Sequence, residues 1–194
     1  MESKNIRLGC VVMAAGNARR FGENKLSAVI GERSLMERTL DAVPCKLFEK
    51  VVVVTQYDWV ETLAATRGFL PIRNEEPEKG LSRTIQLGLN ELLDLDGVLF
   101  LVSDQPWLKE ETVEAEIRLF LANSDKIIAL SHDGQRGNPC IFPKRFFSQL
   151  LALEGDRGGS AVIRQHEDDL LLLEADKIEL RDIDTKEELE RAGN

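Results

Sequence analysis

The chain has 194 residues, of which 30% are charged and 43% hydrophobic, and its formal net charge is -9. This composition is typical of a globular domain, and the acidic balance argues against a general nucleic-acid coat, which needs a basic face. No apolar run approaches the roughly 20 residues of a membrane span. The three cysteines form no CxxC pair, and the two histidines do not lie at metal-ligand spacing. We therefore expect reduced thiols in a cytoplasmic protein, and no zinc site.

Apolar runs rich in β-branched residues alternate along the chain with segments of helical periodicity. We expect strands over 8–14, 51–55, 97–103 and 127–131, a short strand over 68–72, and helices over 35–43, 59–67, 84–95 and 111–121. This alternation predicts an α/β fold, a three-layer α/β/α sandwich with a mostly parallel central sheet. No repeat or flexible linker interrupts the pattern, so we expect a single domain over residues 1–194.

Two places in this pattern carry helix-start signals. Ser34 is followed three residues later by Glu37, and Thr185 is followed by Glu188. This is the spacing of a capping box, in which each side chain bonds the backbone of the other residue. The tail over 177–192 therefore predicts a strand, a tight turn and a final helix.

The loop after the first expected strand combines small residues with positive charge. Sites in doubly wound sheets lie beyond the carboxyl ends of the strands. There, Ala14, Ala15 and Gly16 would let backbone N–H groups approach a ligand closely. Arg20 and Lys25 follow with charges suited to phosphate oxygens. The loop matches neither the Walker A pattern nor GxGxxG. We expect it to hold a phosphate chain, with a solvated basic loop as the alternative.

Five stretches of the chain together resemble a known family. They are MAAGNARRFGENK (13–25), SDQP (103–106), GNP (137–139), GDRG (155–158) and DIDTKEEL (182–189). They look like motifs of the nucleotide-sugar-type nucleotidyltransferases, and most of all like those of the molybdenum cofactor cytidylyltransferases. The resemblance implies a Rossmann-like fold and transfer of a nucleoside monophosphate from CTP to molybdopterin, or to its molybdenum-bearing form, with release of pyrophosphate. Ala18 and Ser160 depart from the family, which usually has serine and arginine there.

The resemblance also implies which residues bind the nucleotide. Residues 14–16, Arg20, Lys25, Gly80 and Ser82 would contact the nucleoside triphosphate, and Arg20 and Lys25 would stabilise its charge during catalysis. Ser82 also fits as the N-cap of the helix that follows. No general base is expected, because the attacking group is already a phosphate oxygen.

Acidic residues at two places predict a magnesium site. Asp104 directly follows an expected strand, where a carboxylate can hold Mg²⁺ against triphosphate oxygens. It is also an expected catalytic residue, and it lies too far upstream to cap the next helix. Asp182 and Asp184 alternate in the expected strand of the tail, so their side chains would share a side. The resemblance favours Asp182 as the second metal ligand. Asp184 is the alternative, unless it only supports the turn before Thr185.

The acceptor is expected to lie against a third group of residues. The resemblance assigns Gly137, Asn138, Pro139 and Asp156 to its pocket. The region 131–160 carries several glycines and prolines, which favour an irregular, substrate-facing insertion. Asp156 precedes a helical run whose N-terminus could take a phosphate, and a plain loop between two helices is the alternative.

Other functions stay open at this point. A transferase that uses GTP or another triphosphate, with a different phosphorylated acceptor, would need the same first loop. A non-catalytic carrier that delivers the cofactor to a molybdenum hydroxylase would not need Arg20, Lys25 and Asp104 together. A dinucleotide-binding oxidoreductase would need a glycine fingerprint that the chain lacks. The expected partners are small-molecule substrates and, in the carrier case, a hydroxylase client, without nucleic acid or membrane. The oligomeric state is left open.

Overall fold

The computed structural model describes residues 5–16 and 25–192 of the chain. Within these residues, seven strands form one sheet in the order β5-β4-β1-β6-β8-β7-β9, and β2 pairs with β3. The strands are β1 (Leu8–Ala14), β2 (Val29–Ile30), β3 (Arg33–Ser34), β4 (Lys50–Thr55), β5 (Leu70–Arg73), β6 (Gly97–Val102), β7 (Ile127–His132), β8 (Gln135–Pro143) and β9 (Leu170–Glu174). The helices are α1 (Leu35–Asp41), α2 (Asp58–Thr66), α3 (Leu81–Asn90), α4 (Glu110–Ala122), α5 (Phe147–Leu151), α6 (Ser160–Ile163) and α7 (Lys186–Ala192). Only β8 runs against the other strands of the sheet, so the mostly parallel Rossmann-like fold is confirmed.

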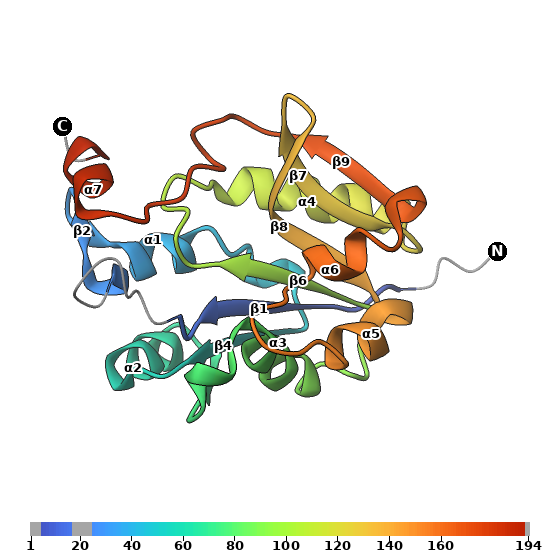
Figure 1. Cartoon of the computed structure of the whole chain (residues 1–194), viewed down its shortest axis with the longest axis horizontal. Helices are drawn as coiled ribbons and strands as arrows, with labels where there is room; N and C mark the ends of the chain where they lie inside the picture. The colour runs from blue at the N-terminus through green and yellow to red at the C-terminus, as the bar shows by residue number, and fades with distance from the viewer. Residues whose placement is uncertain (1–4, 17–24, 193–194) are drawn as a thin grey trace.

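Alternate residues of the central strand β1 are buried in different layers. Cys10 and Val12 pack in one cluster with residues of α1, α2 and α4, whereas Val11 packs with residues of α3, α5 and α6. A strand covered on both faces has to be apolar throughout, which explains its unbroken hydrophobic sequence. Figure 1 shows the sheet running through the middle of the molecule, with α7 and β2 together at one end. None of the described helices is long and apolar enough to cross a membrane.

Both expected capping boxes are present. The Ser34 hydroxyl accepts the N–H of Glu37 at the start of α1, and the Glu37 carboxylate accepts the N–H of Ser34 at 2.7 Å. Likewise, Thr185 and Glu188 exchange two bonds of 3.0 and 3.2 Å at the start of α7. These side chains satisfy N–H groups that have no partner within their helix, so local sequence signals fix where these two helices begin.

The region 131–160 is more regular than its composition predicts. Most of its first half is the nine-residue strand β8, which lies between β6 and β7. The pairing with β7 shifts register: Ala129 faces Cys140, but Ser131 faces Arg136. Residues 137–139 fill this irregularity, so a proline without an N–H is accommodated inside the sheet. The sequence pattern does not reveal this strand, because a glycine and a proline occupy its bulge.

The expected strand in the tail is wrong. Residues 175–185, called here the tail segment, contain turns and irregular backbone. The segment does not join the sheet, and β9 is the strand that extends it beside β7. The apolar residues of the segment pack elsewhere: Leu180 lies against the cluster of α1, α2 and α4, and Ile183 is buried beside Ile30 and Leu35.

Candidate active site

The residues of interest gather at one edge of the sheet, where β1, β4 and β6 end. The chain goes from β1 to β4 and β5 on one side and returns to β6 on the other side. Doubly wound folds bind ligands at such a switch point. The ends of the two strands are tied together, since the Ser103 hydroxyl donates to the Met13 carbonyl at 2.9 Å. The loop after β1 and the turn after β6 therefore face the same space.

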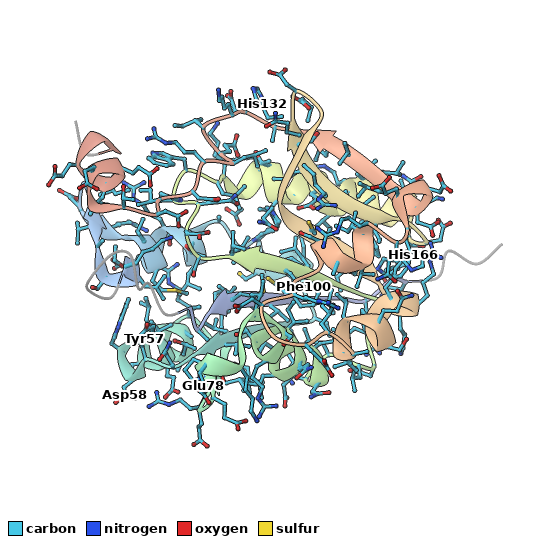
Figure 2. All side chains as sticks on the ribbon, in the orientation of Figure 1. Tyr57, Asp58, Glu78, Phe100, His132 and His166 are labelled. Atoms are coloured by element: carbon cyan, nitrogen blue, oxygen red, sulfur yellow. The ribbon has the colours of Figure 1, made fainter. Side chains whose placement is uncertain are left out.

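Three successive side chains at the end of β4 hold the loop after β1. The carbonyls of residues 14–16 accept bonds from the Thr55 hydroxyl (3.1 Å), the Gln56 amide (2.8 Å) and the Tyr57 hydroxyl (3.1 Å), in that order. Partial burial raises the pKa of Tyr57, so its phenol stays a donor at neutral pH. Figure 2 shows Tyr57 on this side of the molecule. The small residues predicted to approach a nucleotide thus have a fixed backbone.

Lys25 reaches the predicted metal site. Its side chain is only 11% exposed, and its ammonium lies 3.2 Å from Asp104 Oδ2 and 3.0 Å from Asp184 Oδ1. Arg20 and Ala18 belong to the stretch 17–24, which lies outside the described residues. The described part of the loop therefore brings one predicted phosphate-binding cation directly against two carboxylates.

Asp182 completes a group of three carboxylates. Its Oδ1 accepts a bond from the Gln105 amide at 2.9 Å. The residue as a whole is exposed, but burial of its carboxyl group, and then the charges of Asp104 and Asp184, raise its pKa. Lys25 thus contacts two of the three carboxylates and Gln105 contacts the third, and carboxylate oxygens are the ligands that hard divalent cations prefer. The donor set fits a magnesium-type ion.

A pocket of about 170 Å³ opens beside this edge. Its apolar walls include Met13, Phe100, Val102 and Phe142, and its polar and small residues include Arg136, Gly137, Asn138, Gly158, Gly159 and Ser160. Phe100 lies near the centre of the molecule in Figure 2. The structure thus brings two of the predicted acceptor residues, those at 137 and 138, into one pocket. Pro139 and Asp156 are not among its lining residues.

Asp156 instead lies against Gly80, one of the predicted nucleotide-binding residues. Gly80 has a φ of 85°, and a Cβ built on it would come 2.5 Å from Asp156 Oδ1 and 2.5 Å from the backbone of Gly155. The Ser82 N–H donates to the Gly155 carbonyl at 3.0 Å. The expectation that Ser82 caps the helix is wrong, because α3 already begins at Leu81 with Gly80 as N-cap. Gly80 adopts a positive φ as the N-cap, and the helix therefore begins at Leu81, before the start at 84 that the periodicity indicates.

Several residues at this edge were not among the predicted ones. Thr55 ends β4, and Gln56 and Tyr57 follow it, so the rule that sites lie at carboxyl ends of strands would have selected them. Gln105 belongs to the SDQP motif, and its contact with the tail segment depends on a fold that the motif does not reveal. Arg136 precedes the GNP motif, and only the pairing of β8 shows that it faces the pocket.

A second acidic group lies further along the same sheet edge, where β7 and β9 end. His132, Asp133 and Glu174 place three potential ligand atoms within 4.8 Å of one another, whereas the carboxylates around Lys25 are more widely spaced. The His132 ring nitrogen Nδ1 is 3.0 Å from the Ala175 carbonyl. Figure 2 shows His132 at the top of the molecule and Tyr57 toward the lower left, and β8 lies between β6 and β7 in the sheet. This surface group shares no residue with the candidate site.

Comparison with known proteins agrees with this geometry. Residues 10–170 match the MobA-like NTP transferase domain. The chain is 28% identical over 191 residues to the purine catabolism protein PucB of Bacillus subtilis, covering 92% of each protein. It is 33% identical over 123 residues to a probable molybdenum cofactor guanylyltransferase of Pyrococcus horikoshii, covering 63% of this chain and 60% of that protein.

Solved structures share the fold at lower identity. Rv0371c from Mycobacterium tuberculosis superposes with a TM-score of 0.83 at 21% identity, covering 96% of this chain and 97% of the other. A nucleotidyl transferase from Methanothermobacter gives a TM-score of 0.78 at 20% identity, covering 95% of each. The family match spans most of the chain, which confirms the nucleotidyltransferase resemblance without selecting its cytidylyltransferase branch. The chain belongs to the MobA-like NTP transferase domain family of nucleotidyltransferases.

Proposed function

We propose that this chain, as one domain over residues 1–194, transfers a nucleoside monophosphate from CTP to molybdopterin or its molybdenum-bearing form and releases pyrophosphate. The observation that carries the proposal is the meeting of Lys25 with Asp104 and Asp184 beside the held loop 14–16. A cation and several carboxylates at a switch point suit a triphosphate and its metal ion. A carrier that only held the acceptor would not need them.

In this proposal each described residue has a defined task. Asp104 and Asp182 would hold Mg²⁺, which would neutralise phosphate charge when bound. Lys25 would bind triphosphate oxygens as a compact charge. The stretch 14–16, with Gly80 and Ser82, would form the wall against which the nucleotide lies. Positioning and charge neutralisation are the main demands of phosphoryl chemistry. Arg20, outside the described residues, is proposed as a second cation on the triphosphate.

The acceptor would enter the pocket lined by Gly137 and Asn138, with Pro139 behind them and Asp156 at the neighbouring loop. The pocket has apolar walls, which suit a flat ring system. Arg136 lines it and offers positive charge for an acceptor phosphate. This arginine supplies at another position the charge that the family usually has where this chain has Ser160.

GTP is the second candidate donor. The relative from Pyrococcus horikoshii is named a probable molybdenum cofactor guanylyltransferase, so a purine nucleotide is a specific alternative. The relative named PucB is associated with purine catabolism, which leaves room for another acceptor. A divalent ion is supported by a structure of Rv0371c in complex with manganese together with the carboxylates around Lys25.

A thermal-shift panel tests the proposal. Wild type, Asp104→Asn and Asp133→Asn are each heated with CTP, GTP, ATP or UTP, with and without Mg²⁺. A ligand that binds only the folded state raises the melting temperature by mass action. We expect a magnesium-dependent shift with CTP that Asp104→Asn abolishes and Asp133→Asn, in the separate surface group, retains. A shift with GTP alone would replace CTP as donor, and no shift with any nucleotide would refute the transferase site.

A further inference from the structure

The tail segment is irregular, yet it brings Asp182 to the candidate metal site. An irregular backbone has no ladder to fix a side chain, so its position depends on individual contacts. The turn after β6 provides them. The Ile183 N–H donates to the Asp104 carbonyl at 2.9 Å, and the Arg181 guanidinium lies 5.4 Å from the centre of the Trp107 ring. Asp104 and the tail segment are therefore anchored to each other.

Gln105 makes the contact that reaches the Asp182 carboxylate itself. The side chain is almost fully buried, at 4% exposure. Its Nε2 donates to Asp182 Oδ1 at 2.9 Å and to the Leu180 carbonyl at 3.2 Å. Both partners are acceptors, so only the amide nitrogen can face them. With two hydrogens on this nitrogen, the amide can bond the Asp182 carboxylate and the Leu180 carbonyl at the same time.

The oxygen of the same amide group is in an unfavourable environment. Gln105 Oε1 is buried and has no hydrogen-bond partner among the described residues. Leaving a buried acceptor unpaired costs about 1–3 kcal/mol. An apolar side chain of similar size would avoid that cost while filling the same space. The glutamine is therefore better explained by what its nitrogen holds than by packing.

Lys25 does not hold Asp182 in the same way. Its ammonium contacts Asp104 and Asp184. The Asp182 carboxylate instead accepts a hydrogen bond from Gln105. A triphosphate would compete with Asp104 and Asp184 for the Lys25 ammonium, but the neutral Gln105 amide offers it no charge to attract. Carboxylates that ligate a metal are typically oriented by hydrogen bonds of this kind.

We propose that Gln105 is a positioning residue that holds the Asp182 carboxylate toward the divalent cation. This inference rests on the proposed function, since it takes Asp182 as a metal ligand. Partners of this kind typically change metal affinity 10- to 100-fold when they are removed.

The test measures binding of Mn²⁺ alone, by the electron paramagnetic resonance signal of free Mn²⁺, without nucleotide. The variants are Gln105→Leu, Gln105→Glu, Asp182→Asn and the double variant Gln105→Leu/Asp182→Asn. We expect Gln105→Leu to weaken Mn²⁺ binding about 10-fold and the double variant to bind as Asp182→Asn does. Such non-additivity shows that Gln105 acts through Asp182. Gln105→Glu keeps the size but cannot donate when ionised, so it serves if Gln105→Leu does not fold.

Arg181→Ala is the matched control. It removes another anchor of the tail segment, the contact with Trp107, without touching the Asp182 carboxylate. Hydrogen exchange of the Ile183 amide is expected to speed up in both Arg181→Ala and Gln105→Leu, while only Gln105→Leu loses Mn²⁺ affinity. An equal loss in Arg181→Ala would overturn the proposal, because general anchoring would then explain the effect.

Two other outcomes separate this inference from the proposed function. If Asp182→Asn weakens Mn²⁺ binding and Gln105→Leu does not, Gln105 is not a positioning residue and the metal site stands. If Asp182→Asn binds Mn²⁺ as wild type does, Asp182 is not a ligand. Both the second-ligand assignment and the role of Gln105 are then wrong.

Discussion

Gly80, the N-cap of α3, lies against the loop that contains Gly155 and Asp156. The substitution Gly80→Ala should push the two segments apart. A side chain at positive φ costs about 1–2 kcal/mol. At Gly80 the added Cβ would also lie 2.5 Å from Gly155 backbone, which has no flexible end to move aside. Overpacking of this kind adds about 1–3 kcal/mol. We expect a loss of about 2–5 kcal/mol in the free energy of unfolding.

The chain offers a control for the strain alone. Gly68 has a similar φ of 76°, but a Cβ there would have nothing within 4 Å among the described residues. Gly68→Ala should therefore cost only about 1–2 kcal/mol. In a protein of this size each kcal/mol lowers the melting temperature by about 2–4 °C.

Urea unfolding and the nucleotide-induced thermal shift together test this reasoning. Gly80→Ala should lose more stability than Gly68→Ala, and it alone should reduce the shift caused by the nucleotide, because the Gly155 carbonyl that accepts the Ser82 N–H has to move. Equal stability losses in the two variants would show that the close approach is relieved easily. An unchanged nucleotide shift in Gly80→Ala would remove this loop from the binding site.

Three further changes have defined outcomes. Both oxygens of the fully buried Glu116 lack hydrogen-bond partners among the described residues, and burial raises its pKa well above 4.5. The folded state therefore keeps a proton that the unfolded chain loses, so stability should fall as pH rises above about 4.5, and Glu116→Gln should flatten this urea-unfolding profile. Lys25→Met removes the cation that competes for Asp104, so Mn²⁺ alone should bind about tenfold tighter by calorimetry while nucleotide binds more weakly. Ser34→Ala removes the cap of α1 and should cost about 1 kcal/mol in urea unfolding.

Each of these outcomes can fail in a recognisable way. A wild-type stability that stays level from pH 5 to pH 8, as that of Glu116→Gln should, would mean that Glu116 is solvated or paired. Weaker Mn²⁺ binding in Lys25→Met would show that the lysine supports the cation site instead of competing for it. No stability change in Ser34→Ala would mean that solvent replaces the capping bond at no cost.

The sheet could be read from the sequence because β1, β4, β6 and β7 are unbroken apolar runs. The rule that sites lie at carboxyl ends of strands selected Asp104 and the loop that leads to Lys25, but the ion pair between them is a finding of the structure. The contacts of the tail segment could not be read in the same way. The alternation around Ile183 has the period of a strand, but whether it pairs depends on which edge is free. That depends on β9, whose run of leucines was not recognised as a strand.

The same limit applies to the division of roles among the acidic residues. Alternation placed Asp182 and Asp184 on one side, but the structure gives them different partners, the Gln105 amide and the Lys25 ammonium. The spacing of residues along a segment predicts which side chains share a face of that segment. It does not predict contacts with residues that lie 77 or 159 positions away in the sequence. For this reason the candidate ligands were predictable and the residues that hold them were not.

The reversed strand β8 has a consequence for how the pocket can select its ligand. Because it runs against its neighbours, its first residues reach the edge where the other strands end. Residues 140–143 pair with β6, whereas residues 137–139 have no partner in the pairings with β6 and β7, so the ladder does not hold this part of the pocket wall. A Cβ on Gly137 would come 3.1 Å from the Leu180 side chain, so this part of the wall rests on the tail segment, and the shape of the pocket depends on where that segment packs.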